Sequence, residues 1–465
     1  MSTSVAKSID HSPKTSQKIG FGEKLAYGSG DFASNVIFSS MSAFLVFYYT
    51  DVVQVSAAAI GTIMLVSRLL DGIVDIIMGF VVDRTRTKYG KARPWLLRMS
   101  IPFGLAAVLL FSVPSMAENM QLIYIFITYN IVNIVYTSIN VPYGVLNSLM
   151  TQDQYERSVV NIIRMIFSMV ASFGITMITL PIVTALGGGP SGWTKTYLVY
   201  GFIAVILFLV TFFFTRERIG SSQLEGQTAQ KEVVSIKDGL KGLIKNKYWA
   251  LLTANGLVTG INMAITMGVN IYYAQYILGD PNLVGILSMA SGIPMIVGLF
   301  FLAPFVKRFG KRNVTIAGAI VTIIGCALVL VNPTNLSWII ITAIIRGIGT
   351  SPGMGVGFAM IADTVEYGEW KTGNRTEGLI FSAQSYGGKA GQGLGAALIG
   401  WILAFGGYIG GAATQSPDAI TAIRVLFIFL PAFISIMQVL ILIPYKLDKE
   451  YPEILKDLER RKEIK

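Results

Sequence analysis

Residues 58–83 read AAIGTIMLVSRLLDGIVDIIMGFVVD, an apolar run that is interrupted by Arg68, Asp71 and Asp75. A helix of roughly 20 mainly apolar residues is long enough to cross a ~30 Å hydrocarbon core. Similar apolar blocks precede and follow this one along the chain. Twelve of them lie near residues 23–50, 58–83, 94–114, 120–150, 158–186, 195–214, 248–276, 283–304, 314–331, 335–365, 376–405 and 420–444. The sequence therefore predicts an all-α membrane protein with twelve transmembrane helices.

The overall composition agrees with a fold that lies in lipid. Of 465 residues, 53% are hydrophobic and only 14% are charged. The net charge of +11 comes from basic residues that gather in particular loops, namely 84–93, 216–247, 307–312 and the segment after Tyr445. The loops on the other side, such as 51–57, 115–120, 187–196, 277–282 and 331–337, carry only Lys195 as a basic residue. This positive-inside bias predicts a multi-pass protein of the cell (inner) membrane with both termini cytoplasmic, and it argues against nucleic acid as a partner.

The longest polar interruption divides the spans into two sets of six. We expect a cytoplasmic leader at 1–22, a six-helix bundle at 23–215, a cytoplasmic linker at 216–247, a second bundle at 248–444 and a cytoplasmic tail at 445–465. Each half has a basic loop after its second span, 79–94 and 303–314, which suggests an internal repeat. Two such halves enclose a central cavity in many secondary transporters that work by alternating access.

Span two carries the most informative ionisable residues. Arg68, Asp71 and Asp75 are spaced three and four apart, which places them on one helix face within an arc of roughly 60°. Charged groups at this depth are costly and are functional candidates. Two neighbouring carboxylates either bind a small cation or hold a proton, because close like charges resist joint ionisation. The alternative is a structural ion-pair cluster, although Arg68 can neutralise only one aspartate.

Other spans offer groups that could contact a sugar. Asp31 in span one is followed one turn later by Asn35, and a carboxylate can accept two hydrogen bonds from neighbouring hydroxyls. The alternative is a helix-start residue at the membrane surface. Span five carries Arg164, and span eleven carries Lys389 on a polar face that we expect to line the pathway.

Two spans contain proline among their polar residues. In span four, Asn140 and Tyr143 flank Pro142, and we expect a broken segment whose free carbonyl groups face the cavity. In span ten, the run RGIGTSPGMGVG begins at Arg346 and contains Pro352, so we do not expect an unbroken helix there. The alternative for Arg346 is a tightly packed helix from which the side chain extends outward.

Four stretches carry a family resemblance. They are GSGDF at 28–32, LLDGIVDIIMG at 69–79, DRTRTKYGKARPW at 83–95 and ADTVEYGEWKTGNRTEG at 362–378. Together they resemble the glycoside-pentoside-hexuronide:cation symporter family, of which the melibiose permeases are members, and the resemblance covers nearly the whole chain. It implies a major facilitator fold and symport of a sugar with a proton, sodium or lithium ion.

The resemblance also implies roles for individual residues. Asp71 and Asp75 would form the cation site with the Thr137 hydroxyl, and Lys389 matches the family's lysine near that site. Asp31 and Arg164 would bind the sugar. Asn140 and Gly144 stand where the melibiose permeases have an aspartate and a tryptophan. Asn140 is therefore a candidate at both sites, sodium use is in doubt, and pentosides, galactosides and hexuronides all stay open. The sugar-contact candidates are Asp31, Asn35, Asn140, Tyr143, Arg164, Arg346 and Lys389.

A third set of residues suits conformational control. Ion pairs at helix ends can stabilise one state of a carrier and break in the other. The candidates for this role are Arg68, Asp83, Arg84, Asp363, Glu366 and Arg375.

The sequence argues against an enzyme. The single histidine, His11, lies in the leader, and the single cysteine, Cys326, lies inside a span. A nucleophile with a positioned base is therefore not available, and neither is a thiolate metal site. We expect no cofactor beyond the coupling H⁺ or Na⁺, and a functional monomer in the lipid bilayer. Two alternatives to a symporter stay open, an uncoupled sugar facilitator and a membrane sugar sensor.

Overall fold

A computed structural model describes residues 19–151, 153–219, 243, 245–373 and 377–463. The first half of the chain forms α1 (Phe21–Phe47), α2 (Ala57–Arg84), α3 (Arg93–Leu110), α4 (Glu118–Met150), α5 (Gln154–Ala185) and α6 (Gly189–Phe214). The second half forms α9 (Lys247–Tyr276), α10 (Leu283–Phe309), α11 (Lys311–Val329), α12 (Leu336–Thr372), α13 (Glu377–Phe405), α14 (Pro417–Arg424), α15 (Leu430–Leu442) and α16 (Leu447–Glu463). The described residues also include two π-helical segments, η1 (Tyr48–Val52) after α1 and η2 (Val425–Phe429) between α14 and α15.

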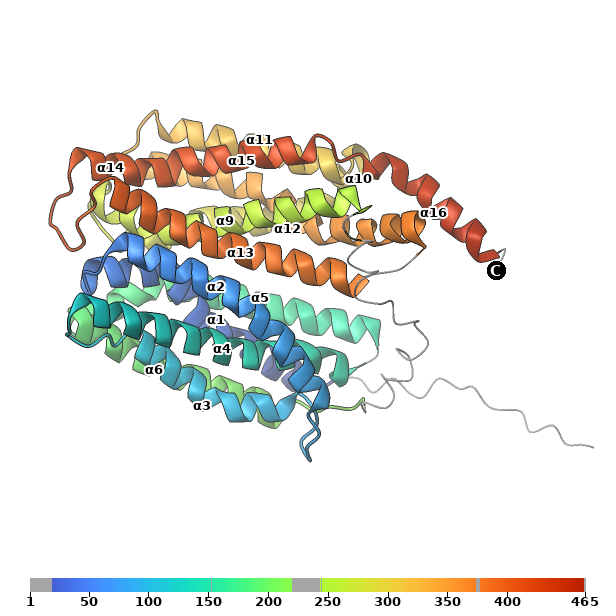
Figure 1. Ribbon diagram of the computed structural model, residues 1–465, viewed down its shortest axis with the longest axis horizontal. Coiled ribbons are helices and arrows are strands. Elements are labelled where there is room, and N and C mark those ends of the chain that lie inside the picture. Colours follow the sequence, from blue (N-terminus) through green and yellow to red (C-terminus); the bar gives the residue numbers. More distant parts are fainter. Residues whose placement is uncertain (1–18, 152, 220–242, 244, 374–376, 464–465) are drawn as a thin grey trace, which may run out of the picture.

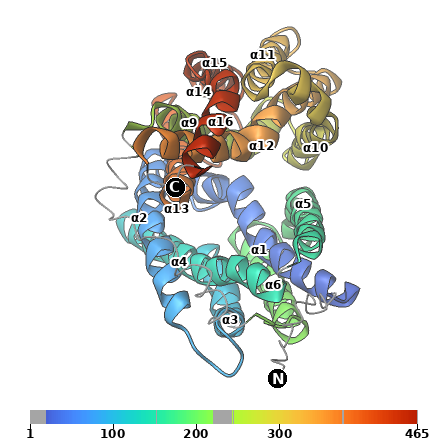
Figure 2. The same ribbon diagram turned by 90° about the vertical axis from the view of Figure 1, so that its right-hand side faces the viewer.

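The long helices form two groups that lie side by side (Figures 1 and 2). Helices α1–α6 make one half and α9–α15 make the other, with their axes running in roughly the same direction. Ten of the described helical stretches are long and apolar enough to cross a membrane. Helices α2 and α13, which carry Asp71, Asp75 and Lys389, run beside them. The twelve-helix prediction is confirmed for the part of the chain that the structure describes.

The expectation that proline breaks two spans is wrong. Helix α4 continues through Pro142, and α12 continues through Pro352 for 37 residues. Proline removes one backbone hydrogen bond, and neighbouring helices make this loss tolerable in a membrane bundle. The segment expected to be a tail contains the helix α16. Its Leu447, Ile454 and Leu458 are buried against the second half of the protein.

The two halves repeat one structural detail at the end where α6 stops and α9 starts, called here the linker end. The Arg93 guanidinium, at the start of α3, donates to the Phe212 carbonyl near the end of α6. The Arg312 guanidinium, at the start of α11, donates in the same way to the carbonyls of Leu442 and Ile443 at the end of α15. The weak repeat in the sequence thus has a counterpart in three dimensions.

An acidic side chain caps the helix start in each of these repeats. The Glu217 carboxylate accepts backbone N–H bonds from Lys91, Ala92 and Arg93 at 2.8–2.9 Å. The Asp448 carboxylate accepts one from Arg312 at 2.8 Å. These bonds satisfy N–H groups that a helix start leaves without partners. At the linker end, each helix start and the acidic residue that caps it therefore belong to the same half.

In the described part of the chain, the main helix pairs between the halves are α2 with α13, α1 with α9 and α5 with α10. The backbones of α2 and α13 approach closely near the opposite end, called here the far end. A Cβ atom added at Gly61 would lie 2.8 Å from the Ala397 carbonyl oxygen, so glycine permits this backbone contact. The α2–α13 pair brings the ionisable residues of the two halves together.

Candidate functional site

A compact charged cluster lies where α2, α4 and α13 meet. The Lys389 ammonium of α13 lies 3.0 Å from Asp71 Oδ2 and also contacts Asp75 Oδ2. The Thr137 hydroxyl of α4 lies 3.0 Å from Asp71 Oδ1 and 3.2 Å from Asp75 Oδ1. One lysine from the second half thus bridges two carboxylates from the first half.

The cluster is formally neutral, with two carboxylates and two cations. Arg68 supplies the second cation, and its guanidinium lies 3.6 Å from Asp71 Oδ2. The Asp71 side chain is 2% exposed, whereas those of Asp75 and Lys389 are 31% and 23% exposed. Asp75 is therefore the more accessible of the two carboxylates.

An aromatic ring on α13 packs beside this cluster. The Tyr386 ring lies over the α2 backbone at Gly72, where an added Cβ atom would come within 2.4 Å of it. Glycine between the two aspartates thus allows α13 to approach α2. This contact holds Lys389, one turn further along α13, beside its partners.

A second ion pair joins α1 and α5. Arg164 Nε lies 3.4 Å from Asp31 Oδ2, and the Arg164 side chain is 36% exposed. The guanidinium lies over the Tyr143 ring, 5.5 Å from its centroid. That ring stacks on Tyr27 at 4.5 Å, and each tyrosine hydroxyl donates to the backbone carbonyl of the other. The buried Tyr143 ring thus packs against one face of the Arg164 guanidinium.

Asn35 adds a further polar contact between α1 and α5, on the side toward the far end. Its amide donates to the Ser168 hydroxyl of α5 and to the Asp31 carbonyl, both at 2.8 Å. The structure therefore brings together four of the predicted sugar-contact residues, Asp31, Asn35, Tyr143 and Arg164. Asp31 and Arg164 have the charged groups that suit sugar hydroxyls.

The other three predicted sugar-contact residues lie elsewhere. Lys389 belongs to the charged cluster on α2. The Asn140 amide donates to the Tyr136 carbonyl at 3.2 Å, within its own helix. Arg346 is buried inside the second half, where its guanidinium lies over the Phe427 ring at 4.8 Å and its stem packs near Gly325. Sequence spacing alone did not indicate that the Arg346 side chain lies away from the Asp31–Arg164 pair.

Two of the predicted gating residues, Asp83 and Asp363, form ion pairs within their own half. Asp83 pairs with Lys91 at 2.6 Å, and Asp363 pairs with Lys311 at 2.5 Å. Arg84 is exposed at the end of α2, and Glu366 lies on α12 near Asp363. Arg375 lies outside the described residues. At the linker end, these ion pairs therefore belong to separate halves.

The far end carries a polar network that the sequence analysis missed. Asp51 of η1 accepts hydrogen bonds from the hydroxyls of Tyr276 and Tyr408, both at 2.6 Å, and from the Gly411 N–H at 3.3 Å. The neighbouring Thr50 hydroxyl lies 2.8 Å from the Tyr272 hydroxyl. All these partners come from the second half, so the network joins the halves. The signal in the sequence was an acid directly after a span, in a loop that otherwise lacks charge.

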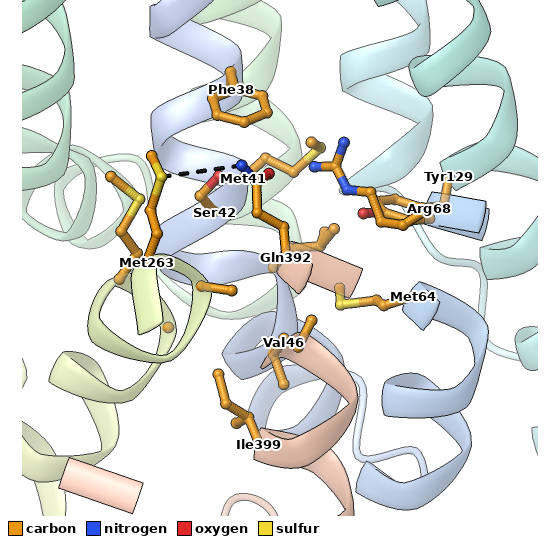
Figure 3. Close-up of a pocket in the computed structure, with 15 residues that line it drawn as sticks. Phe38, Met41, Ser42, Val46, Met64, Arg68, Tyr129, Met263, Gln392 and Ile399 are labelled. Carbon is orange, nitrogen blue, oxygen red and sulfur yellow. Dashed lines mark hydrogen bonds between the residues drawn. The ribbon is translucent and has the colours of Figure 1, made fainter. Parts of the chain in front are cut away.

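A pocket lies between the charged cluster and the far end. Its walls come from α1, α2, α4, α9 and α13 and are mainly apolar. Figure 3 shows Phe38, Met41, Met64, Met263 and Ile399 around it, with Arg68 and Gln392 as polar members. Among the described residues, no group of three or more His, Cys, Asp or Glu side chains is placed to hold a metal ion.

Two six-helix halves with ionisable groups at their shared interface define a membrane transporter of the major facilitator type. Residues 26–449 match the family model described as MFS/sugar transport protein, and the chain belongs to this family. Its fold and site are those of a carrier and not of an enzyme.

Curated relatives match over nearly their whole length. The isoprimeverose transporter of Lactiplantibacillus pentosus is 34% identical over 95% of this chain and 92% of its own. The putative glycoside/cation symporter YagG of Escherichia coli (strain K12) is 31% identical over 91% of this chain and 92% of its own. Among solved structures, the nucleoside transporter NupG is similar in fold, with a TM-score of 0.65 at 16% identity over 90% of this chain and 98% of its own.

Proposed function

We propose that this protein is a secondary active transporter that imports a sugar or glycoside together with a cation by alternating access. The observation that carries the proposal is the bridge of Lys389 between Asp71 and Asp75 across the two halves. The names of the relatives, an isoprimeverose transporter and a putative glycoside/cation symporter, support a glycoside as substrate. Pentosides, galactosides and hexuronides are the classes to test.

The cation acts through the link between the halves. Lys389 occupies the place that a coupling cation would take between the two carboxylates. When an ion neutralises Asp75, the Lys389 ammonium loses a partner, and the contact between α2 and α13 weakens. Without the ion, the lysine returns and restores a neutral site. This exchange lets the empty and the fully loaded carrier change conformation readily.

A proton is the first candidate for the coupling ion, because Asn140 stands where the melibiose permeases have an aspartate. Two carboxylates and one hydroxyl nevertheless supply five oxygen atoms, which is enough for a sodium ion. The cluster gathers two carboxylates and the Thr137 hydroxyl, while the Asn140 amide is directed to its own helix. Sodium is the second candidate.

The sugar binds at the Asp31–Arg164 pair. The Asp31 carboxylate accepts hydrogen bonds from neighbouring hydroxyls, and the partly exposed guanidinium donates to ring or carboxylate oxygens. The Tyr143 ring packs against the Arg164 guanidinium and restricts its orientation. If the cation raises sugar affinity, the sugar must raise cation affinity by the same factor.

We place the linker end in the cytoplasm because the basic loops gather there. Both termini are then cytoplasmic, and the far end faces outward. The Asp51 network joins the halves at the outer side, while Asp83 and Asp363 pair within separate halves at the inner side. This arrangement corresponds to a carrier closed toward the outside, and the Asp51 network is its outer gate.

The test is sugar-induced ion flux into proteoliposomes that contain the purified protein. External pH is followed while xylosides, galactosides and glucuronides are added, with and without sodium. We expect external alkalinisation with one sugar class in the absence of sodium. Sodium-dependent uptake without a pH change would replace the proton by sodium, and uptake without either ion response would indicate an uncoupled facilitator. Sugar binding without any uptake would indicate a sensor.

A further inference from the structure

We propose that Arg346 and Arg424 form a phosphate-binding site at the far end of the second half, apart from the sugar and cation sites. The ligand is the phosphate group of a membrane phospholipid or a free phosphate ion. This inference goes beyond the proposed function, because it depends neither on the sugar nor on the ion that the protein carries.

Arg346 is a buried cation without a partner of opposite charge. The residue is 8% exposed, and its guanidinium lies over the Phe427 ring, 4.8 Å from the centroid. Its stem packs against α11, where a Cβ atom added at Gly325 would lie 2.8 Å from Arg346 Cγ. In the described part of the chain, the Arg346 side chain forms no ion pair and no hydrogen bond. Its positive charge is therefore not compensated within the protein.

The helices around Arg346 contain no acid that can reach it. The sequences of α9, α10, α11 and α15 hold neither Asp nor Glu. In α12, the first acid is Asp363, which lies about 25 Å further along the helix and pairs with Lys311. At the far end, Asp280 accepts hydrogen bonds in the turn before α10, and Asp418 lies in the first turn of α14. Neither of these two acids forms an ion pair with Arg346.

Phosphate is the anion that suits this arrangement. A buried charge without a counterion is strongly disfavoured in a medium of low dielectric constant. Because the surrounding helices supply no acid, the counterion of Arg346 has to come from outside the protein. A guanidinium presents planar pairs of N–H donors that match the oxygen atoms of a phosphate group. The donors of Arg346 are available for this role.

A second arginine lies beside the same aromatic pair. Arg424 ends α14 and is exposed, three residues before Phe427. The Phe427 ring stacks on Tyr273 with the ring centroids 3.8 Å apart, and Arg424 and Arg346 both act electrostatically on the Tyr273 hydroxyl. That hydroxyl donates to the Pro333 carbonyl in the turn between α11 and α12. One arginine thus lies at the surface of the far end and the other in the interior.

The position of the site favours a lipid as the source of the phosphate. Val331, just after α11, and Phe429, in η2, are exposed apolar residues at this end of the second half. In a membrane, such side chains contact acyl chains, and the phosphate groups lie directly beyond the hydrocarbon core. Long arginine side chains extend along apolar surfaces to reach this level. A phospholipid here places its acyl chains on the exposed residues and its phosphate at Arg424 and Arg346.

The test measures thermal unfolding of the purified full-length protein in a nonionic detergent, after copurified lipid has been removed. The additives are dioleoylphosphatidylglycerol, dioleoylglycerol, which has the same acyl chains and no phosphate, and inorganic phosphate. A ligand at about 100 times its dissociation constant should raise the melting temperature by about 3 °C. We expect this rise with dioleoylphosphatidylglycerol and no rise with dioleoylglycerol. The same rise with inorganic phosphate would assign the site to the free ion.

Three variants test the two arginines. Arg346→Met keeps the apolar stem over Phe427 and removes the charge, so the lipid should no longer raise the melting temperature. Without lipid, this variant should be as stable as the natural protein or more stable, because an uncompensated buried charge has been removed. Arg424→Met changes an exposed residue, which should not affect folding, and should reduce the rise by at least about half. Arg460→Met, at an exposed arginine on α16, is the control and should keep the full rise.

Three results would overturn the site. The first is a natural protein whose melting temperature changes with neither phosphate compound. The second is an equal rise with dioleoylglycerol, since the acyl chains alone would then explain it. The third is a full rise in both Arg346→Met and Arg424→Met, which would place the bound phosphate elsewhere. If Arg346→Met does not fold, Arg424→Met alone decides this third result.

Discussion

Replacing Lys389 by methionine tests the idea that this lysine competes with the coupling ion. Two unit charges 3.0 Å apart attract by about 5.5 kcal/mol at an effective dielectric constant of about 20. Desolvation of the ammonium offsets much of this energy, which leaves a net effect of about 1.5–3 kcal/mol. Without the competitor, the affinity of the site for its coupling ion should rise by about 10- to 100-fold.

The assay measures sugar binding to purified Lys389→Met as proton or sodium concentration is varied. We expect half-maximal binding at about 10- to 100-fold lower ion concentration, together with slow ion release and poor accumulation. Exchange of labelled for unlabelled sugar should continue, since it does not need the empty carrier to return. Lys195→Met, at an exposed lysine near the start of α6, is the matched control. An unchanged ion dependence with full accumulation would refute the competition.

Three further predictions concern other parts of the molecule. Arg164→Lys keeps the charge but loses the planar guanidinium over Tyr143. In binding assays, sugar affinity should therefore fall at least tenfold while ion affinity in the absence of sugar stays the same. Equal losses of sugar affinity and ion affinity would contradict a sugar role for Arg164. Asp51→Ala removes the hydrogen-bond acceptor of Tyr276 and Tyr408 and should weaken the contact between the halves at the far end. In a Ser42→Cys background, the new thiol should then react faster with an impermeant thiol reagent added outside. An unchanged rate would argue against an outer gate. Glu217→Ala uncaps α3 and should lower the free energy of unfolding by about 1–2 kcal/mol, read as a lower melting temperature, with sugar affinity preserved.

The spans and the α2 charges were predictable because their signal is local. A run of apolar residues reports its own burial in lipid, and spacing of three and four fixes the shared face of Arg68, Asp71 and Asp75. The structure keeps Arg68 and Asp71 together as expected. These features need no knowledge of how distant segments pack.

The partners of these charges were harder to predict because they come from other helices. Periodicity places Lys389 on a polar face of its span, but it gives no partner 314 residues away. Only the family resemblance placed this lysine near the cation site. The same limit explains Arg346, which points into its own half toward Phe427.

Local rules also misled at two prolines and one acid. Pro142 and Pro352 suggested breaks, yet packing against neighbouring helices keeps α4 and α12 continuous. Asp51 looked like a loop residue, because its donors Tyr276 and Tyr408 lie in the other half of the chain. Contacts between the halves are set by the packed fold and not by local spacing.

The most direct test of the central claim is sugar accumulation by Asp75→Asn in energised vesicles. Asparagine keeps the size of the side chain but cannot take a proton or pair with Lys389 as a charge. We expect accumulation against a gradient to be lost while exchange of sugar across the membrane persists. Ion-driven accumulation by Asp75→Asn at the level of the natural protein would contradict the assignment of the coupling site.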